Sequence, residues 1–334
     1  MSQPLASLDR PVRLLAAGGT ISMQGERAVP SLDGEALVQV VPELAAVPAL
    51  SAETVLALPG AQIALPQALE LARRACQVAD AGEGVVLTTG TDTLEELGVL
   101  CAMLYDGQAP IVLTGANRPA SRPGADGPAN LLDAVALAGC EAASGLGVVV
   151  VFGGEIHAAM SARKVDSTGP AAFGSPAAGP LGRIVEGRVW LHARPLGPAP
   201  LAPRSLSHRV AIVTAALGDE GELLRAAAQS ADGVVVEALG AGHVTPGMLP
   251  ALREALARVP VVVTCRVQRA SMLFETYGFE GAEPDVRASG AVCAPFLSAA
   301  AARMVLLCCL GSGLDRAGIG TALAPWDARL HFRI

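Results

Sequence analysis

The stretch Val85-Val86-Leu87-Thr88-Thr89-Gly90-Thr91-Asp92-Thr93-Leu94-Glu95-Glu96 passes from a short apolar run through a polar turn into a helical pattern. A run of four or five apolar, mostly β-branched residues is typical of a strand buried on both faces of a sheet. Similar runs occur at 12–16, 111–114 and 148–152. Buried strands separated by helical segments predict a parallel sheet with helices on both faces.

The segments between these runs have the spacing of amphipathic helices. Segments 93–105 and 128–142 are predicted to be helical, and 65–79 has the clearest pattern. Apolar residues recur there at intervals of four and three, as they do along one face of a helix. They are Leu65, Leu69, Ala72, Cys76 and Ala79.

A proline-rich segment then interrupts the alternation. Residues 195–203 contain four prolines in nine residues, a composition typical of a semi-rigid extended linker. Further strands are predicted at 210–214, 234–237 and 261–264, with helices at 220–230, 246–258 and 298–310. We therefore expect an α/β fold with a larger N-terminal parallel-sheet domain and a smaller C-terminal α/β domain. The expected boundaries are 1–195, a linker at 196–208, and 209–334.

The composition argues against two classes of partner. Apolar residues make up 51% of the chain, but no run approaches the ~20 apolar residues that a membrane-spanning helix needs. The net charge of −7, without a cluster of arginines, argues against nucleic acid. We therefore expect a small-molecule substrate rather than a membrane or a nucleic acid.

The cysteines indicate the compartment. Seven cysteines are scattered through apolar segments without a C-x-x-C pair, which is typical of reduced thiols in a reducing compartment. No apolar segment of the kind found in secretory signals precedes the first predicted strand. Both observations favour the cytoplasm.

The basic residues are divided unevenly between arginine and lysine. Of 24 basic side chains, 23 are arginine and one, Lys164, is lysine. Arginine stays protonated in proteins, whereas a lysine can lose its proton when it is buried or lies beside other groups. Lys164 is therefore a candidate for proton-transfer chemistry, and a codon preference for arginine is the alternative explanation.

Two turns that contain glycine and threonine follow predicted strands. Ala17-Gly18-Gly19-Thr20-Ile21-Ser22 follows strand 12–16, and Thr88-Thr89-Gly90-Thr91-Asp92-Thr93 ends strand 85–88. In an open α/β sheet, ligands bind outside the carboxyl ends of the strands. The dinucleotide pattern G-x-G-x-x-G is absent from the first turn, and for that turn taken alone a structural role is the favoured explanation.

Part of the second turn has a structural explanation. Asp92 with Glu95, or Thr93 with Glu96, fits a capping box at the start of the following helix. The capping box does not account for Thr91, whose hydroxyl lies beside a carboxylate at the same edge of the sheet. We therefore keep Thr91 and Asp92 as candidate site residues.

Two later segments complete the candidate site. The loop after strand 111–114 contains Ala116 and Asp126, and Asp126 is expected to cap the next helix or to hold the loop. The segment 162–176 follows strand 148–152 and carries Lys164. A hydroxyl is a poor nucleophile until a base takes its proton. Lys164, oriented by Asp92, could serve as that base for Thr91.

Taken together, these four segments resemble the bacterial L-asparaginase family. They occur in that family's order and approximate spacing, and the resemblance extends to Tyr277-Gly278-Phe279 and Ala288-Ser289-Gly290 near the C-terminus. The resemblance implies larger and smaller α/β domains, usually assembled as a tetramer, so we expect a homo-oligomer. It also implies hydrolysis of asparagine to aspartate and ammonia without a metal or an organic cofactor.

The resemblance assigns expected roles to individual residues. Thr20 matches the threonine that attacks the side-chain amide and forms an acyl-enzyme. Thr91 and Lys164 match the second threonine and its base, and Asp92 matches the carboxylate that orients them and binds the α-ammonium group. Lys164 lies nine residues before Phe173, as in the family. Backbone N–H groups near Thr20 or Thr91 and Ala116 are expected to stabilise an oxyanion. The expected substrate-binding positions are Gly60, Ala61, Thr91, Asp92 and Ala116.

Several positions depart from the family pattern. The flexible-loop tyrosine is replaced by a residue that aligns as Arg27, and a substrate-contacting serine is replaced by Gly60. The histidine before Gly-Thr-Asp is Thr89, and the methionine of Gly-Ala-Met-Arg-Pro is Asn117. These departures put substrate preference and rate in doubt more than the reaction type.

The resemblance is looser in the second domain, where two further positions are matched. Ala241 stands near the place of a substrate-contacting asparagine, and Glu275 is the candidate for an acidic residue contributed across a dimer interface. Two alternatives therefore stay open: an amidohydrolase that acts on glutamine, a D-amino acid amide or another amide, and a weakly active binding protein. The retained Lys164 argues against the binding protein.

Overall fold

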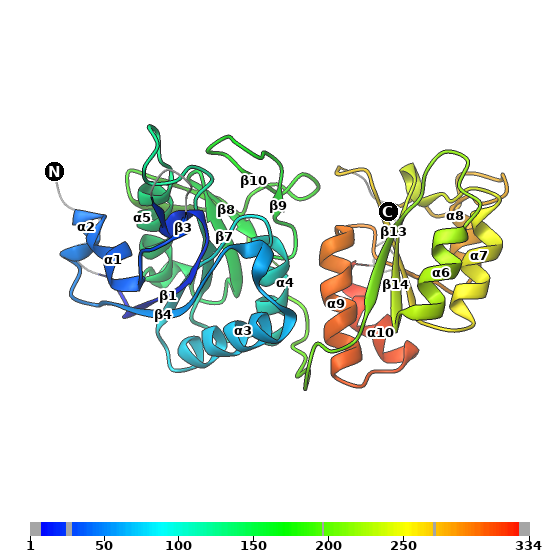
Figure 1. The fold of residues 1–334 in the computed structure, drawn as a ribbon, viewed down its shortest axis with the longest axis horizontal. Helices are drawn as coiled ribbons and strands as arrows, with labels where there is room; N and C mark the ends of the chain where they lie inside the picture. The colour runs from blue at the N-terminus through cyan, green and yellow to red at the C-terminus, as the bar shows by residue number, and fades with distance from the viewer. Residues whose placement is uncertain (1–7, 25–28, 196, 270–271, 327–334) are drawn as a thin grey trace. The chain divides into compact units, whose positions relative to one another are not determined.

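The computed structural model describes residues 8–24, 29–195, 197–269 and 272–326 of the 334-residue chain (Figure 1). The chain divides into two compact units, Met1–Pro200 and Leu201–Ile334, and each unit contains a parallel-rich sheet. The expected α/β fold with a larger and a smaller unit is confirmed. The finer boundaries, with a linker at 196–208, stay a prediction.

The first unit contains an eight-stranded sheet of order β12-β11-β8-β7-β6-β5-β1-β4. Five strands are parallel: β1 Val12–Gly18, β4 Leu50–Leu58, β5 Gly84–Thr88, β6 Ile111–Thr114 and β7 Val148–Phe152. Three antiparallel strands extend it: β8 Glu155–Ala158, β11 Gly182–Val185 and β12 Arg188–Leu191. The four predicted strands of this unit are confirmed, and β4 and the antiparallel strands are additions.

Two short antiparallel pairs lie outside this sheet. They are β2 Met23–Gln24 with β3 Val29–Pro30, and β9 Arg163–Lys164 with β10 Phe173–Gly174. The second pair matters for the site because it contains Lys164.

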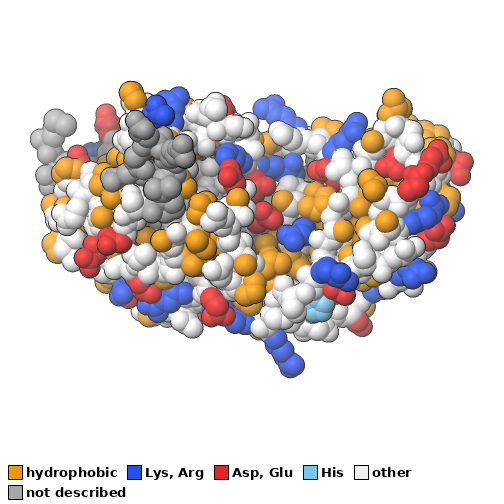
Figure 2. All heavy atoms as spheres, viewed as in Figure 1, with side chains coloured by type: hydrophobic (Ala, Val, Ile, Leu, Met, Phe, Trp, Pro, Cys, Tyr) orange, Lys and Arg blue, Asp and Glu red, His pale blue; other side chains and the backbone are white. Residues whose placement is uncertain are grey.

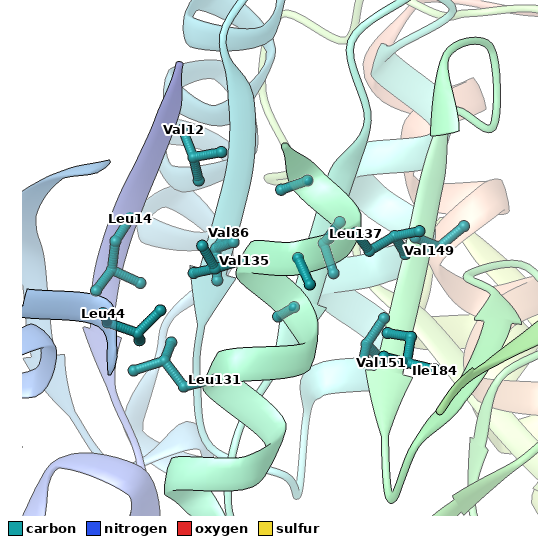
Figure 3. Packing of buried hydrophobic residues seen from close by; sticks show 14 of the residues in the cluster. Val12, Leu14, Leu44, Val86, Leu131, Val135, Leu137, Val149, Val151 and Ile184 are labelled. Carbon is teal, nitrogen blue, oxygen red and sulfur yellow. The ribbon is translucent and has the colours of Figure 1, made fainter. Parts of the chain in front are cut away.

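Helices cover both faces of the large sheet. They are α1 Gly34–Gln39, α2 Pro42–Ala45, α3 Leu65–Asp80, α4 Leu94–Leu104 and α5 Gly127–Ala138. On one face, α1, α2 and α5 pack on inward side chains such as Leu14, Val86 and Val149 (Figure 3). On the other face, α3 and α4 cover the alternate side chains, so that Gly98 of α4 faces Leu113 and Val150. The parallel strands are therefore buried on both sides, as their unbroken apolar sequences predict.

One crossover has the opposite hand to the others. The connections β5-α4-β6 and β6-α5-β7 step in the same direction across the sheet, yet α4 and α5 cover opposite faces. The crossover through α3 shares its hand with the one through α4, because it also covers that face and steps the same way. Since nearly all such crossovers are right-handed, β6-α5-β7 is the left-handed exception.

The second unit is a four-stranded parallel sheet of order β13-β14-β15-β16. Its strands are β13 Val210–Thr214, β14 Gly233–Ala238, β15 Val261–Cys265 and β16 Val292–Cys293. Its helices are α6 Glu222–Ser230, α7 Met248–Leu256, α8 Glu283–Ala288, α9 Ala299–Gly311 and α10 Arg316–Leu323. In this unit α6 and α7 pack on one face, and α9 covers the other (Figure 1).

Three features of the helices, the surface charge and the cysteines can be compared with the composition. No helix within the described ranges is long and apolar enough to cross a membrane. On the face drawn in Figure 2, the coloured residues carry basic and acidic side chains interspersed over both units. The seven cysteines, all of them in described segments, are thiols rather than disulfides.

Candidate active site

Three loops at the carboxyl ends of β1, β4 and β5 meet through their backbones. The Gly19 N–H donates to the Leu58 carbonyl at 3.0 Å. A Cβ atom placed on Gly19 would lie 2.6 Å from the Gly90 Cα, and one on Gly90 would lie 2.7 Å from the Gly60 Cα. Gly19 also has a φ of 81°, which disfavours other residues. Only glycines allow these three loops to approach so closely.

This contact brings Thr20 and Thr91 into neighbouring loops, because each follows one of the touching glycines. Thr20 begins the short 3₁₀ turn Thr20–Ser22 and is half-buried. The Ser22 hydroxyl closes that turn by donating to the Gly19 carbonyl at 2.9 Å. Among the described residues, the partners of Thr91 and Lys164 do not include the Thr20 hydroxyl.

Lys164 joins two of the predicted site residues directly. Its Nζ lies 2.9 Å from the Thr91 Oγ1 and 2.8 Å from the Asp92 Oδ1. Thr91 is 5% exposed, whereas the side chains of Lys164 and Asp92 are 23% and 68% exposed. A buried hydroxyl is thus connected to a partly solvated amine and carboxylate. Such a chain of groups can pass a proton from the hydroxyl toward solvent.

A hairpin holds the Lys164 backbone in place. Lys164 in β9 pairs with Phe173 in β10, and the Phe173 ring packs against Phe152 at the end of β7, with ring centroids 5.0 Å apart. The Lys164 N–H donates to the Glu95 Oε2 at 2.9 Å. The spacing between Lys164 and Phe173 in the sequence therefore has a structural reason, because the two residues lie opposite each other in the hairpin.

Glu95 is used differently from its expected role. The predicted capping box is wrong, because Thr93 at the N-cap of α4 makes no side-chain capping hydrogen bond. Glu95 instead accepts from Lys164, and the Thr93 hydroxyl donates to the Gly60 carbonyl at 3.1 Å. Burial raises the pKa of the Glu95 carboxyl, although the Lys164 N–H acts in the opposite direction. Both side chains tie separate loops together instead of capping their own helix.

Asp126 organises the loop after β6. Its carboxylate accepts the N–H groups of Asn117 at 3.0 Å and Arg118 at 2.8 Å, and it makes no capping hydrogen bond to α5. The Asn130 amide also binds the Gly115 carbonyl at 3.0 Å. Of the two expected roles for Asp126, holding the loop is the observed one. Ala116, which this loop carries, is buried at 1% exposure.

Asn117 reaches the centre of the site, which the sequence did not predict. Its Oδ1 lies 3.4 Å from the Thr91 Oγ1, and its Nδ2 donates to the Gly169 carbonyl at 2.9 Å. Gly169 belongs to a turn in which Asp166 accepts the N–H groups of Thr168 and Gly169 at 2.7 and 2.8 Å. The hydrogen bond from the Thr168 N–H, followed by that from Gly169, lowers the pKa of the Asp166 carboxyl.

Two protein-family models together match most of the chain. The family model described as "Asparaginase, N-terminal" matches residues 11–197, and the "Glutaminase/Asparaginase C-terminal domain" matches residues 209–323. The chain belongs to the asparaginase family. It is therefore an enzyme of the amidohydrolase type.

Individual relatives agree with this assignment. A "Probable L-asparaginase" of Deinococcus radiodurans is 37% identical over 94% of this chain and 97% of its own length. A "Glutaminase-asparaginase" of Pseudomonas fluorescens is 37% identical over 54% of this chain and 52% of its own. The solved structure of a probable cytoplasmic L-asparaginase from Campylobacter jejuni has a TM-score of 0.82 at 28% identity, covering 94% of this chain and 99% of that one.

In this asparaginase the surroundings of residue 60 favour glycine. A Cβ atom on Gly60 would lie 2.9 Å from the Thr93 Oγ1 and 3.0 Å from the Gly90 carbonyl oxygen. A serine at this position would therefore require the Thr93 side chain to shift and would crowd the Gly90 backbone. The next expected substrate-binding residue, Ala61, is exposed.

The remaining candidates of this asparaginase belong to other parts of the chain. Ala241 and Glu275 belong to the second unit, where Ala241 has an unusual φ of 61° and Glu275 is exposed. Arg27, which aligns with the flexible-loop tyrosine, lies outside the described residues. Within the described ranges, no group of three or more His, Cys, Asp and Glu side chains is arranged to hold a metal ion.

Proposed function

We propose that the protein hydrolyses the side-chain amide of L-asparagine to L-aspartate and ammonia. The observation that carries the proposal is the position of the Lys164 Nζ, which is within hydrogen-bond distance of both the Thr91 hydroxyl and the Asp92 carboxylate. A lysine in this position serves as a proton acceptor for a hydroxyl. The Deinococcus radiodurans relative, a probable L-asparaginase that aligns over 94% of the chain, supports asparagine as the substrate.

In the proposed mechanism, Thr20 is the nucleophile. The neutral Lys164 amine takes the Thr91 proton, and Thr91 in turn takes the proton of the Thr20 hydroxyl. The Thr20 oxygen then forms a bond to the amide carbon, and the C–N bond breaks as the nitrogen gains a proton and leaves as ammonia. Water, activated by the same relay, cleaves the resulting ester and releases aspartate. The backbone contact of Gly19 with Gly90 supports this relay, because it brings the two threonine loops together.

The substrate-binding part of the proposal concerns the groups around these threonines. Asp92, whose side chain is 68% exposed, is suited to bind the substrate's α-ammonium group. The backbone N–H groups of Gly60, Ala61 and Ala116 are the proposed contacts for its carboxylate and for the oxyanion of the transition state. Each preorganised donor of this kind contributes about 3–4 kcal/mol to transition-state stabilisation.

The test is ammonia release from L-asparagine, L-glutamine and their D-isomers at equal concentration. The proposal expects the largest kcat/KM with L-asparagine. A preference for L-glutamine would favour the second candidate, which the Pseudomonas fluorescens glutaminase-asparaginase supports. No ammonia from any amide would contradict catalysis and favour a binding protein. Mass spectrometry of protein quenched during turnover should detect an aspartyl ester on the Thr20 peptide.

We also propose a cytoplasmic homo-oligomer. The seven thiols favour a reducing compartment, and the Campylobacter jejuni relative is a probable cytoplasmic enzyme. Cell fractionation and light scattering of the purified protein test the two parts separately. Recovery from an oxidising compartment or a monomeric mass would contradict them.

A further inference from the structure

The Asn117 side-chain amide has a fixed orientation in the site. Its Nδ2 lies 2.9 Å from the Gly169 carbonyl and 3.5 Å from the Asp166 carbonyl. Carbonyl oxygens only accept hydrogen bonds, so the NH₂ group must face this turn and the amide oxygen must face Thr91. The Asn117 backbone is held as well, because its N–H donates to Asp126.

This orientation restricts where the Thr91 hydrogen can point. Among the described residues, the hydroxyl has two hydrogen-bonding neighbours, the Lys164 Nζ at 2.9 Å and the Asn117 Oδ1 at 3.4 Å. When Lys164 is an ammonium ion it can only donate, so the Thr91 hydrogen must point to Asn117. When Lys164 is a neutral amine, its lone pair can also accept the Thr91 hydrogen, and in that arrangement the Asn117 oxygen loses its donor. The protonated state therefore depends on the contact between Thr91 and Asn117, whereas the neutral state has an arrangement that does not need it.

We propose that Asn117 is a positioning residue that holds the Thr91 hydrogen away from Lys164, favours the protonated resting form of Lys164, and thereby sets the pH at which Lys164 can accept a proton. The effect of Asn117 on catalysis rests on the proposed function. A neighbour that favours the resting form delays formation of the amine, so the acidic limb of the rate profile lies at higher pH than it would without Asn117.

Other charged groups surround these atoms, and the principal variant, Asn117→Leu, must leave them unchanged. Lys164 is flanked by Asp92 at its Nζ, by Glu95 at its backbone, and by Arg163. Asp126 binds the Asn117 backbone, and Arg118 and Asp166 lie at the turn that Asn117 contacts. Substitution of Asn117 by leucine changes none of these charges.

The composition of the chain makes the proton on Lys164 directly measurable. Because Lys164 is the sole lysine, the full-length protein labelled with ¹³C- and ¹⁵N-lysine gives one lysine side-chain signal in NMR spectra. The midpoint of its titration reports protonation at Nζ without any substrate. We expect Asn117→Leu to lower this midpoint by about half a pH unit, the effect of losing one weak hydrogen bond.

Two further variants separate a proton effect from a structural one. Arg118→Met is the matched control, because the Arg118 Nε donates to the Thr168 carbonyl of the same turn at 3.4 Å. It removes a positive charge, so it is expected not to lower the midpoint. Asn117→Asp loses the same turn contact as Asn117→Leu but keeps an acceptor and adds a negative charge, so it is expected to raise the midpoint. An unchanged midpoint in Asn117→Leu, or an equal fall in Arg118→Met or Asn117→Asp, would overturn the inference.

The same variants distinguish this inference from the proposed function. In the pH profile of kcat/KM for L-asparagine, the acidic limb should move in the same direction as the NMR midpoint. A midpoint that moves in a protein that hydrolyses no amide would leave the Asn117 inference standing and refute the function. A midpoint that stays fixed in an active enzyme would refute the Asn117 inference and leave the proposed function standing.

Discussion

The two units carry polar groups at the carboxyl ends of their parallel sheets, but these groups are arranged very differently. In the first unit, Lys164 joins Thr91 to an Asp92 side chain that is 68% exposed. In the second unit, the His243 Nε2 lies 3.0 Å from the Oε2 of Glu283, which is fully buried. The first network ends on a mostly exposed carboxylate, whereas the second ends on a carboxylate with no exposed surface.

The second network is also saturated. The Glu283 Oε1 accepts the N–H groups of Thr276 at 2.6 Å and Tyr277 at 3.0 Å, and the His243 ring packs edge-on against Tyr277 and Phe279. Burial alone would raise the pKa of Glu283, but the hydrogen bonds from Tyr277, Thr276 and His243 outweigh it and lower that pKa. A group held this firmly stabilises its unit but exchanges protons poorly. The carboxyl ends of a parallel sheet provide a position for a site, but the exposure and hydrogen bonding of the polar groups there determine whether they can take part in catalysis.

The largest effect on activity is expected from substitution of Lys164, the residue that links Thr91 to the exposed Asp92 carboxylate in the first network. Lys164→Met should lower kcat for L-asparagine by about 10²–10⁴-fold, the usual contribution of a general base, without changing the fold. Lys164→Arg should be equally impaired, because arginine keeps its proton. Ammonia release and circular dichroism measure the two properties. Retention of even a tenth of native activity by either variant would argue against Lys164 as the base.

The second prediction concerns the backbone contact beneath that network. Gly19→Ala should destabilise the protein by roughly 3–5 kcal/mol, because the methyl group meets the Gly90 backbone and φ is 81°. Gly82→Ala is the matched control: its φ is 90°, but a Cβ there meets nothing within 4 Å, so only about 1–2 kcal/mol should be lost. Urea unfolding gives both values. Equal losses would show that backbone strain, not loop contact, makes Gly19 necessary.

The smallest effects contrast two carboxyls, one from each unit, whose pKa values are shifted in opposite directions. The pKa of Glu283 is lowered, so its stabilisation is present above the usual value near 4.5 and is lost as pH falls through the folded-state pKa. Glu283→Gln should therefore destabilise the protein most at neutral pH. The pKa of Glu95 is raised by burial, so ionisation of this carboxyl costs folding free energy. The cost grows as pH rises above the usual value near 4.5 and is complete above the raised folded-state pKa, so Glu95→Gln should stabilise the protein at neutral pH.

Thermal unfolding at pH 7 and pH 4 measures both variants. The sign of the change at pH 7 should differ between Glu283→Gln and Glu95→Gln, and both changes should shrink at pH 4. The same sign for both would contradict the expected contrast between a stabilising Glu283 carboxylate and a destabilising Glu95 carboxylate.

The sequence predicted the buried strands and the long helices, because each carries its own periodicity. It did not predict β4, whose residues are half-buried at the sheet edge, or the short antiparallel strands, which have no continuous apolar run. The candidate residues Thr91, Asp92 and Lys164 were found from local motifs and composition. Their roles stay predictions until the variants are measured.

Asn117 and Glu95 illustrate what local patterns miss. Asn117 contacts Gly169, 52 positions away, and Glu95 contacts Lys164, 69 positions away. Nothing near Asn117 in the chain reveals its partner, and Glu95 fits a helix-capping pattern that the fold does not use. Such roles arise only when the sheet and its loops bring distant segments together.

The contact of Gly19, Gly60 and Gly90 also bears on how this enzyme could change over time. Three loops approach one another through main-chain atoms, with the Thr93 hydroxyl as a further tie to the Gly60 carbonyl, so their positions depend little on the side chains that face the substrate. Side chains that face the substrate can then be exchanged, one at a time, without the loops losing their register. A scaffold of this kind lets substrate preference drift under selection while the proton-transfer groups keep their geometry, and it offers protein engineers the same freedom.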